Sequence, residues 1–227
     1  MSRRLVIYGA HGATGQILTA EALAQGHHVT AVTRRPELLE QQAREELGQY
    51  LVGDHAQLRV VRADVYDPPS VASTIDGQDA IVCLVSEPFS WKPITVYSQA
   101  ASTIVQGMHA AAVRRLLFTT SGGTNPQYDP AEGFFFGRLF KPTIGRTADQ
   151  DMRTAEALVR QSGLDWTIVR PARLVTQSSR AAYRVVEGYI VPGQLRTARV
   201  DLARFLLDDI ATAAYQHKAV AIASDLS

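Results

Sequence analysis

Two kinds of hydrophobic pattern alternate along the chain. Short apolar or β-branched runs are typical of buried strands, and longer stretches with apolar residues three or four apart are typical of helices. The predicted strands are 4–8, 28–33, 58–65, 79–86, 113–121, 164–171, 181–187 and 218–223. The predicted helices are 16–24, 70–75, 95–112, 149–160 and 200–207. This alternation is typical of a parallel α/β sheet whose strands are joined by crossover helices.

Two long segments interrupt the alternation. Residues 37–56 are polar and predict a surface helix and loop. Residues 122–150 contain three prolines and the apolar run Phe134-Phe135-Phe136, and long connections without regular structure tend to be lids or binding loops. We therefore expect a single domain over residues 1–227, in which 122–150 and 174–199 form loops on the substrate side.

Composition narrows the function classes. The chain has 227 residues, a formal net charge of +1 and one cysteine, so nothing indicates a nucleic-acid-binding surface, an internal disulfide or a cysteine-based zinc cluster. The six histidines show no metal-ligand spacing, and no apolar run is long enough for a membrane span. We expect a cytoplasmic monomer or homodimer that acts on a small molecule, with no nucleic-acid or membrane partner and no metal.

The strongest chemical signal is the turn after the first strand, where Gly9, Gly12 and Gly15 have the spacing G-x-x-G-x-x-G. Glycine permits a tight turn and leaves room for a diphosphate beside the backbone. The helix that follows directs unpaired N–H groups and the positive end of its dipole at an anion. The turn therefore predicts a dinucleotide cradle, with a glycine-rich connection that binds nothing as the alternative.

The end of the second predicted strand bears on which dinucleotide is bound. An acidic residue there binds the ribose 2′-hydroxyl of NAD, whereas arginine accommodates the 2′-phosphate of NADP. This chain has Arg34 and Arg35 there, and the first acidic residue after the strand is Glu37. The pattern favours NADP, and a solvated basic turn is the alternative.

Polar residues also follow the later strands. Asp64 lies after the third predicted strand, where it could meet an adenine amino group or cap the next turn. The fourth strand ends at Leu84 to Ser86, and the fifth ends in Thr120 and Ser121. Because ligands bind outside the carboxyl ends of parallel strands, all of these residues are site candidates.

Four segments together, 9–15, 77–82, 116–121 and 162–171, resemble the atypical short-chain dehydrogenase/reductases. In particular, the chain is similar from residue 4 to residue 223 to the NAD(P)-binding group that includes NmrA-like proteins and the biliverdin-IXβ and flavin reductases. The resemblance implies a Rossmann-type doubly wound parallel sheet with a small C-terminal substrate-side extension. It also implies cofactor contacts from Gly9, His11, Gly12, Ala13, Thr14, Gly15, Gln16, Thr33, Arg34, Arg35, Asp64, Val65, Leu84, Val85, Ser86, Thr119, Thr120, Pro171, Ala172 and Arg173.

The chain departs from typical members of this family in its proton relay. None of the eight tyrosines is followed four residues later by lysine, so the usual Tyr-x-x-x-Lys pair is absent. Ser121 would then be the catalytic hydrogen-bond donor nearest the acceptor, or it would only cap the turn after its strand. Arg173 could hold an anionic group, a cofactor phosphate or a surface salt bridge. Asp151 and Glu156 would favour the dipole of the helix predicted at 149–160.

These features predict an NADPH-dependent reductase of a small or planar organic acceptor of the quinone, flavin or carbonyl type. Hydride acceptance by an electron-poor ring needs positioning more than a dedicated acid, so the missing pair does not exclude such an enzyme. Two alternatives stay open. One is an NADP-sensing regulatory protein without turnover, suggested by the missing pair and the phenylalanine run. The other is a non-redox enzyme of the epimerase or dehydratase kind.

Overall fold

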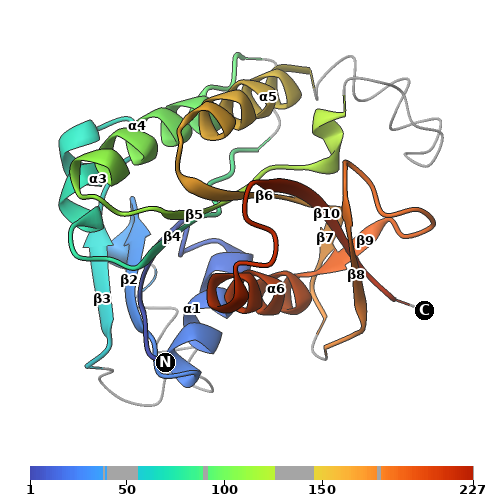
Figure 1. The fold of residues 1–227 in the computed structure, drawn as a ribbon, viewed down its shortest axis with the longest axis horizontal. Helices are drawn as coiled ribbons and strands as arrows, with labels where there is room; N and C mark the ends of the chain where they lie inside the picture. Colours follow the sequence, from blue (N-terminus) through green and yellow to red (C-terminus); the bar gives the residue numbers. More distant parts are fainter. Residues whose placement is uncertain (38, 40–55, 89–91, 126–145, 178–179, 227) are drawn as a thin grey trace.

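The computed structural model describes residues 1–37, 39, 56–88, 92–125, 146–177 and 180–226. Eight strands form one sheet in the order β3-β2-β1-β4-β5-β6-β10-β8 (Figure 1). Their bounds are β1 Arg4–Tyr8, β2 His28–Thr33, β3 Leu58–Arg62, β4 Ala80–Cys83, β5 Arg115–Thr119, β6 Asp165–Pro171, β8 Tyr183–Glu187 and β10 Lys218–Ser224. All neighbours are parallel except β8, which pairs antiparallel with β10. The order of the first six is that of dinucleotide-binding doubly wound sheets, so the predicted fold class is confirmed.

Helices cover both faces of the sheet. On one face lie α3 (Pro68–Ile75), α4 (Val96–Ala110) and α5 (Arg146–Gln161); on the other lie α1 (Ala13–Ala24) and α6 (Arg199–Thr212) (Figure 1). Side chains alternate between the faces of a strand, and the core follows this rule. In the central strand β1, Val6 and Tyr8 belong to the core under α3–α5, whereas Leu5 and Ile7 belong to the core under α1 and α6.

Several predicted boundaries shift in the structure. The strand predicted at 113–121 ends at Thr119, so Thr120 and Ser121 lie just beyond the strand end. The strand predicted at 58–65 ends at Arg62, which places Asp64 in the loop after it. The helix predicted at 149–160 begins three residues earlier, at Arg146.

The substrate-side segment predicted as a loop at 174–199 contains regular structure. Strand β7 (Arg173–Val175) pairs in parallel with β9 (Arg196–Ala198) in a second, two-stranded sheet. Strands this short carry too few residues for a hydrophobic period, which is why the sequence did not reveal them. Most of the loop predicted at 37–56 and the run Phe134-Phe135-Phe136 lie outside the described residues. Within the described part, no helix is long and apolar enough to span a membrane.

Candidate functional site

Two cavities lie at the carboxyl ends of the parallel strands. The small cavity has a volume of about 320 Å³ and lies beside the ends of β2 and β3. The large cavity has a volume of about 750 Å³ and extends past β5 and β6 to the β7–β9 sheet. The two share walls formed by Gly9, Gly12 and residues 84–86. They therefore adjoin as one site that offers a separate cavity to each half of a two-part ligand.

The glycine turn forms the boundary between the cavities, and each glycine has a separate steric reason. Gly9 has φ +82°, and a Cβ there would lie 2.6 Å from the Leu84 carbonyl oxygen. A Cβ on Gly15 would lie 2.7 Å from the Ala10 Cα, so Gly15 permits close packing of α1 against the turn. A Cβ on Gly12 would meet only the Gly9 carbonyl oxygen within 4 Å, at 3.3 Å, and would otherwise occupy cavity space.

Helix α1 begins beside this cradle. No side chain caps its N-terminus, and no acidic residue lies in its first turn. Its first N–H groups therefore lack an intrahelical partner and lie at the positive end of the helix dipole. Ala13 and Thr14, both predicted cofactor contacts, line the large cavity here. The backbone thus fits a diphosphate, the group that a dinucleotide would place in the cradle.

The small cavity collects the residues predicted for the adenosine end of the cofactor. Arg34 and Arg35 are exposed at the end of β2 and line this cavity. The Thr33 hydroxyl accepts a hydrogen bond from the Arg35 backbone N–H at 3.1 Å, which fixes the turn. Arg62 Nε donates to the Arg34 carbonyl oxygen at 3.3 Å, so a third guanidinium lies next to the pair.

Asp64 and Val65 line the same cavity. One carboxylate oxygen of Asp64 accepts a hydrogen bond from the Tyr66 backbone N–H at 3.1 Å. Asp64 therefore stabilises its own turn and also lines the cavity, and its contact with an adenine amino group stays a prediction. Asp67 occupies the N-cap position of α3, although its side chain makes no capping hydrogen bond.

His11 and Gln16 occupy different positions relative to the small cavity. The buried Nδ1 of His11 has no hydrogen-bond partner among the described residues, although His11 lines the cavity. An unpartnered buried nitrogen is costly unless a ligand or water satisfies it. Gln16 lines neither cavity; its side-chain amide donates to the His11 carbonyl oxygen at 2.8 Å. Gln16 therefore stabilises the turn without lining either cavity.

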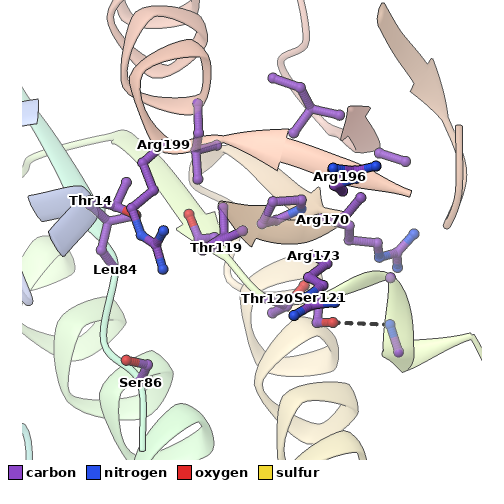
Figure 2. A pocket seen from close by; sticks show the side chains of 18 of the residues that line it. Thr14, Leu84, Ser86, Thr119, Thr120, Ser121, Arg170, Arg173, Arg196 and Arg199 are labelled. Atoms are coloured by element: carbon purple, nitrogen blue, oxygen red, sulfur yellow. Dashed lines mark hydrogen bonds between the residues drawn. The ribbon is translucent and has the colours of Figure 1, made fainter. Parts of the chain in front are cut away.

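The three hydroxyls predicted at the end of β5 all line the large cavity (Figure 2), but their hydrogen bonding differs. Thr119 Oγ1 is buried and has no partner among the described residues. Thr120 Oγ1 donates to Glu156 Oε1 at 2.8 Å. Ser121 Oγ accepts from the Gly123 N–H at 3.1 Å and so caps the short 3₁₀ turn Gly122–Thr124. This cap is the structural role proposed for Ser121, and its own proton is still available for a ligand.

A buried ion pair lies under these hydroxyls. Arg170 Nε donates to Glu156 Oε1 at 2.9 Å, and Arg170 NH2 bonds to the other carboxylate oxygen. Arg170 and Glu156 are only 2% and 6% exposed. Arg170 also donates to the Gly188 carbonyl oxygen at 2.8 Å and lies 3.9 Å over the Tyr189 ring. The pair thus ties α5, β6 and residues 188–189 together beside the cavity.

The expectation that Asp151 and Glu156 serve the dipole of their helix was wrong. Helix α5 starts at Arg146, so neither residue lies in its first turn. Glu156 is the buried partner of Arg170 and also accepts from the Thr124 hydroxyl at 3.2 Å. Asp151 accepts the Tyr97 backbone N–H at 2.8 Å and so stabilises the start of α4 instead.

The far wall of the large cavity contains residues that the sequence did not single out. Pro171, Ala172 and Arg173 were predicted and do line it. They are joined by Tyr97, Tyr189, Arg196 and Arg199, which come from α4, the 188–195 segment, β9 and α6. Burial raises the pKa of Tyr97, so its phenol stays protonated and can donate a hydrogen bond.

Figure 2 shows how the arginines of this cavity divide. Arg170, Arg173 and Arg196 lie together on one side, whereas Arg199 points toward Thr14 and Leu84 on the other. Within the described residues, no group of three or more His, Cys, Asp or Glu is placed to hold a metal ion. The site therefore offers backbone N–H groups, hydroxyls and guanidinium groups, which suit a ligand with phosphates.

Comparison with known proteins agrees with this geometry. A protein family described as NAD(P)H-binding matches residues 9–213. A chloroplastic protein of Arabidopsis thaliana is 23% identical over 184 residues, which cover 76% of this chain and 60% of that protein. This chain thus spans about 60% of the length of that curated relative.

Solved structures share the fold at low sequence identity. A short-chain dehydrogenase/reductase from Veillonella parvula, in complex with NADP, has a TM-score of 0.77 at 17% identity, covering 99% of this chain and 96% of that one. An oxidoreductase from Lactococcus lactis has a TM-score of 0.76 at 17% identity, covering 99% of this chain and 92% of that one. A Rossmann-fold NAD(P)-binding protein from Shigella flexneri has a TM-score of 0.72 at 18% identity, covering 99% of this chain and 95% of that one.

Proposed function

The chain belongs to the NAD(P)H-binding family, and on this premise we propose that it is an NADPH-dependent reductase of a small or planar organic acceptor. The acceptor would be of the quinone, flavin or carbonyl type. The observation that carries the proposal is the site in which a small cavity with two arginines adjoins a large cavity at the glycine turn. We further expect the protein to act in the cytoplasm as a monomer or homodimer.

The choice of NADPH over NADH rests on charge at the end of β2. Arg34 and Arg35 line the small cavity, and Arg62 is bonded to the same turn. Guanidinium groups bind phosphate through paired, charge-assisted hydrogen bonds. The acid in this cavity, Asp64, follows β3 and already accepts a backbone N–H. The end of β2 thus suits a ribose 2′-phosphate better than a 2′-hydroxyl.

The chain's own residues would bind and orient the reactants. The glycine turn and the N-terminus of α1 would hold the diphosphate, and bound NADPH would supply the hydride. The apolar groups of Leu84, Val85 and Pro171 would exclude water beside the nicotinamide. Ser121 would donate its hydroxyl proton in a hydrogen bond to the acceptor, and Thr119 and Tyr97 are further O–H groups that line the same cavity.

The test is consumption of NADPH, followed at 340 nm, with a panel of quinones, flavins and carbonyl compounds. Replacing Arg34 and Arg35 by alanine should raise the KM for NADPH by about 10-fold to 100-fold and leave that for NADH nearly unchanged, because the lost bonds are charge-assisted. Arg59→Ala is the matched control, since Arg59 is exposed on β3 and lines neither cavity.

Two results would contradict the reductase. If NADPH binds but no acceptor on the panel oxidises it, the sensing protein becomes the better explanation. If a product forms without equimolar loss of NADPH, the chemistry is non-redox. Equal effects of the double variant on NADPH and NADH would contradict the role given to Arg34 and Arg35.

A further inference from the structure

Two arginines of the large cavity lie side by side on the small sheet. Strands β7 and β9 pair in parallel with Arg173 and Arg196 in direct register, and the Arg173 N–H donates to the Leu195 carbonyl oxygen at 3.1 Å. Paired residues of neighbouring strands point to the same face of a sheet, at a strand spacing of about 4.8 Å. Both side chains are exposed and both line the cavity. Figure 2 shows them on the same side of it.

The charge of this cavity is unbalanced. Arg170, Arg173, Arg196 and Arg199 line it, and no Asp or Glu among the described residues does. The whole chain, by contrast, has a net charge of only +1. Glu156 neutralises Arg170. Two guanidinium groups with no carboxylate partner in the described structure then remain on the β7–β9 sheet.

The fourth arginine has a different environment. Arg199 donates to the Thr176 hydroxyl at 3.0 Å, and its side chain points toward Thr14 at the start of α1. That position suits the cofactor diphosphate. Arg173 and Arg196 lie on the other side of the cavity, so a cofactor seated in the cradle would not satisfy them.

Like charges that face each other across paired strands are destabilising. An anion between them would remove the repulsion, and two guanidinium groups provide the forked donors that match carboxylate or phosphate oxygens. The wall beside them is apolar: Leu174, Ile190 and Leu195 line the same cavity, and Leu195 is 54% exposed. A ligand that satisfies this wall combines a negative group with a flat apolar body.

We propose that Arg173 and Arg196 form an anion subsite, so that the acceptor reduced by this protein carries a carboxylate or phosphate group. That the bound anion is the acceptor rests on the proposed reductase function. Binding of the anion itself needs no turnover, and this separates the two tests. The subsite leaves the reacting part of the ligand near Ser121 and Thr119, which line the same large cavity.

The binding test titrates 1-naphthoate, 1-naphthyl phosphate and the uncharged 1-naphthamide into the NADP-bound protein by calorimetry. The natural protein should bind at least one anion about tenfold or more tightly than the amide, as expected for a charge-assisted contact. Whichever anion binds more tightly identifies the group. The double variant R173Q/R196Q should lose this preference, whereas Arg59→Gln, on the exposed face of β3, should keep it.

Further variants and readouts separate the explanations. R173K and R196K keep the charge but lose the fork, so each should lose part of the preference, and their circular dichroism should match the natural protein. Fluorescence titration of NADPH should give the same affinity in all variants. If the affinity for NADPH falls together with that for the anion, the arginines hold a cofactor phosphate and the subsite is overturned.

The 340 nm assay keeps the subsite and the reductase apart. It compares 1,4-naphthoquinone with a carboxylated naphthoquinone as acceptor, and R173Q/R196Q should raise the KM of the carboxylated one alone by about 10-fold or more. An anion preference in calorimetry without any NADPH oxidation would retain the subsite and remove the reductase. Oxidation of NADPH with no anion preference in either measurement would remove the subsite and retain the reductase.

Discussion

The small cavity and the large cavity are built in different ways. The small cavity consists of strand ends and backbone: the glycine turn, the end of β2 at Arg34 and Arg35, and the loop after β3. The large cavity is shaped by side chains from remote parts of the chain, among them Thr120, Arg170 and Tyr189, with Glu156 behind them. Short segments of sequence therefore determine the first, and tertiary packing determines the second.

This difference separates the parts of the proposed activity. A cofactor cradle made of backbone depends on few side chains, so its chemistry is general to the sheet topology. The proposed acceptor wall belongs to β7, β9 and residues 188–195, none of which lines the small cavity. Changes there can alter the acceptor without altering the cofactor. Probes of each cavity can test this independence: adenosine 2′,5′-bisphosphate for the small one and an acceptor for the large one.

The largest effect is expected for Glu156→Gln. The substitution keeps the shape of the side chain but leaves the buried Arg170 guanidinium without its counter-charge. Removing one partner of a buried pair costs about 3–5 kcal/mol of unfolding free energy. Chemical denaturation measures this loss. Affinity for adenosine 2′,5′-bisphosphate should be unchanged, whereas the KM for the acceptor should rise.

The matched control is Glu21→Gln. Glu21 also pairs with an arginine, Arg180, at 2.7 Å, but that arginine side chain is 53% exposed. A pair of this kind contributes at most about 1 kcal/mol. Equal losses of unfolding free energy in the two variants would show that the buried Glu156–Arg170 pair stabilises the fold no more than an exposed pair does.

The second effect is expected for Gly9→Ala, at the boundary of the two cavities. The alanine would have to adopt φ +82°, and its Cβ would lie 2.6 Å from the Leu84 carbonyl oxygen. Strain and overpacking together should lower the unfolding free energy by about 2–4 kcal/mol. Because Gly9 lines both cavities, the affinity for the bisphosphate probe and for the acceptor should both fall.

Gly26→Ala isolates the conformational part of this effect. Gly26 has a similar φ of +80°, but a Cβ there would meet nothing within 4 Å. It should cost only about 1 kcal/mol and leave both probes unaffected. If Gly9→Ala behaves like Gly26→Ala, the close approach of the turn to Leu84 does not stabilise the cradle.

The same contrast explains what could be predicted from sequence. Local chemistry determines the ends of β1 and β2, the glycine turn and the paired arginines. The structure has β2 at the predicted residues 28–33. The family match at residues 9–213 confirms the family resemblance and the binding of NAD(P)H that the glycine turn predicted. The individual cofactor contacts stay predictions, apart from Arg173, which our proposal assigns to the acceptor instead. All of them except Gln16 line one of the two cavities.

The acceptor side could not be predicted in the same way. Glu156 reaches Arg170 only because α5 packs beside β6, and no local spacing encodes that meeting. Arg196 becomes a neighbour of Arg173 through a strand of three residues. One signal was present: Arg170 directly follows the apolar pair Ile168 and Val169 inside a buried strand, and a charge there needs a buried partner.

The smallest effect, and the one with the most informative sign, is expected for Thr119→Val. Thr119 Oγ1 is buried without a partner among the described residues, so removing it at nearly constant volume should raise the unfolding free energy by about 1 kcal/mol. The neighbouring Thr120→Val should lower it by about 1–2 kcal/mol, because Glu156 loses a charge-assisted hydrogen bond. If the Thr119 hydroxyl serves a ligand of the large cavity, Thr119→Val should also weaken acceptor turnover while bisphosphate binding stays the same. A destabilised variant would show that the lone hydroxyl is not a cost to the fold, and a variant that turns over normally would show that it is not part of the site.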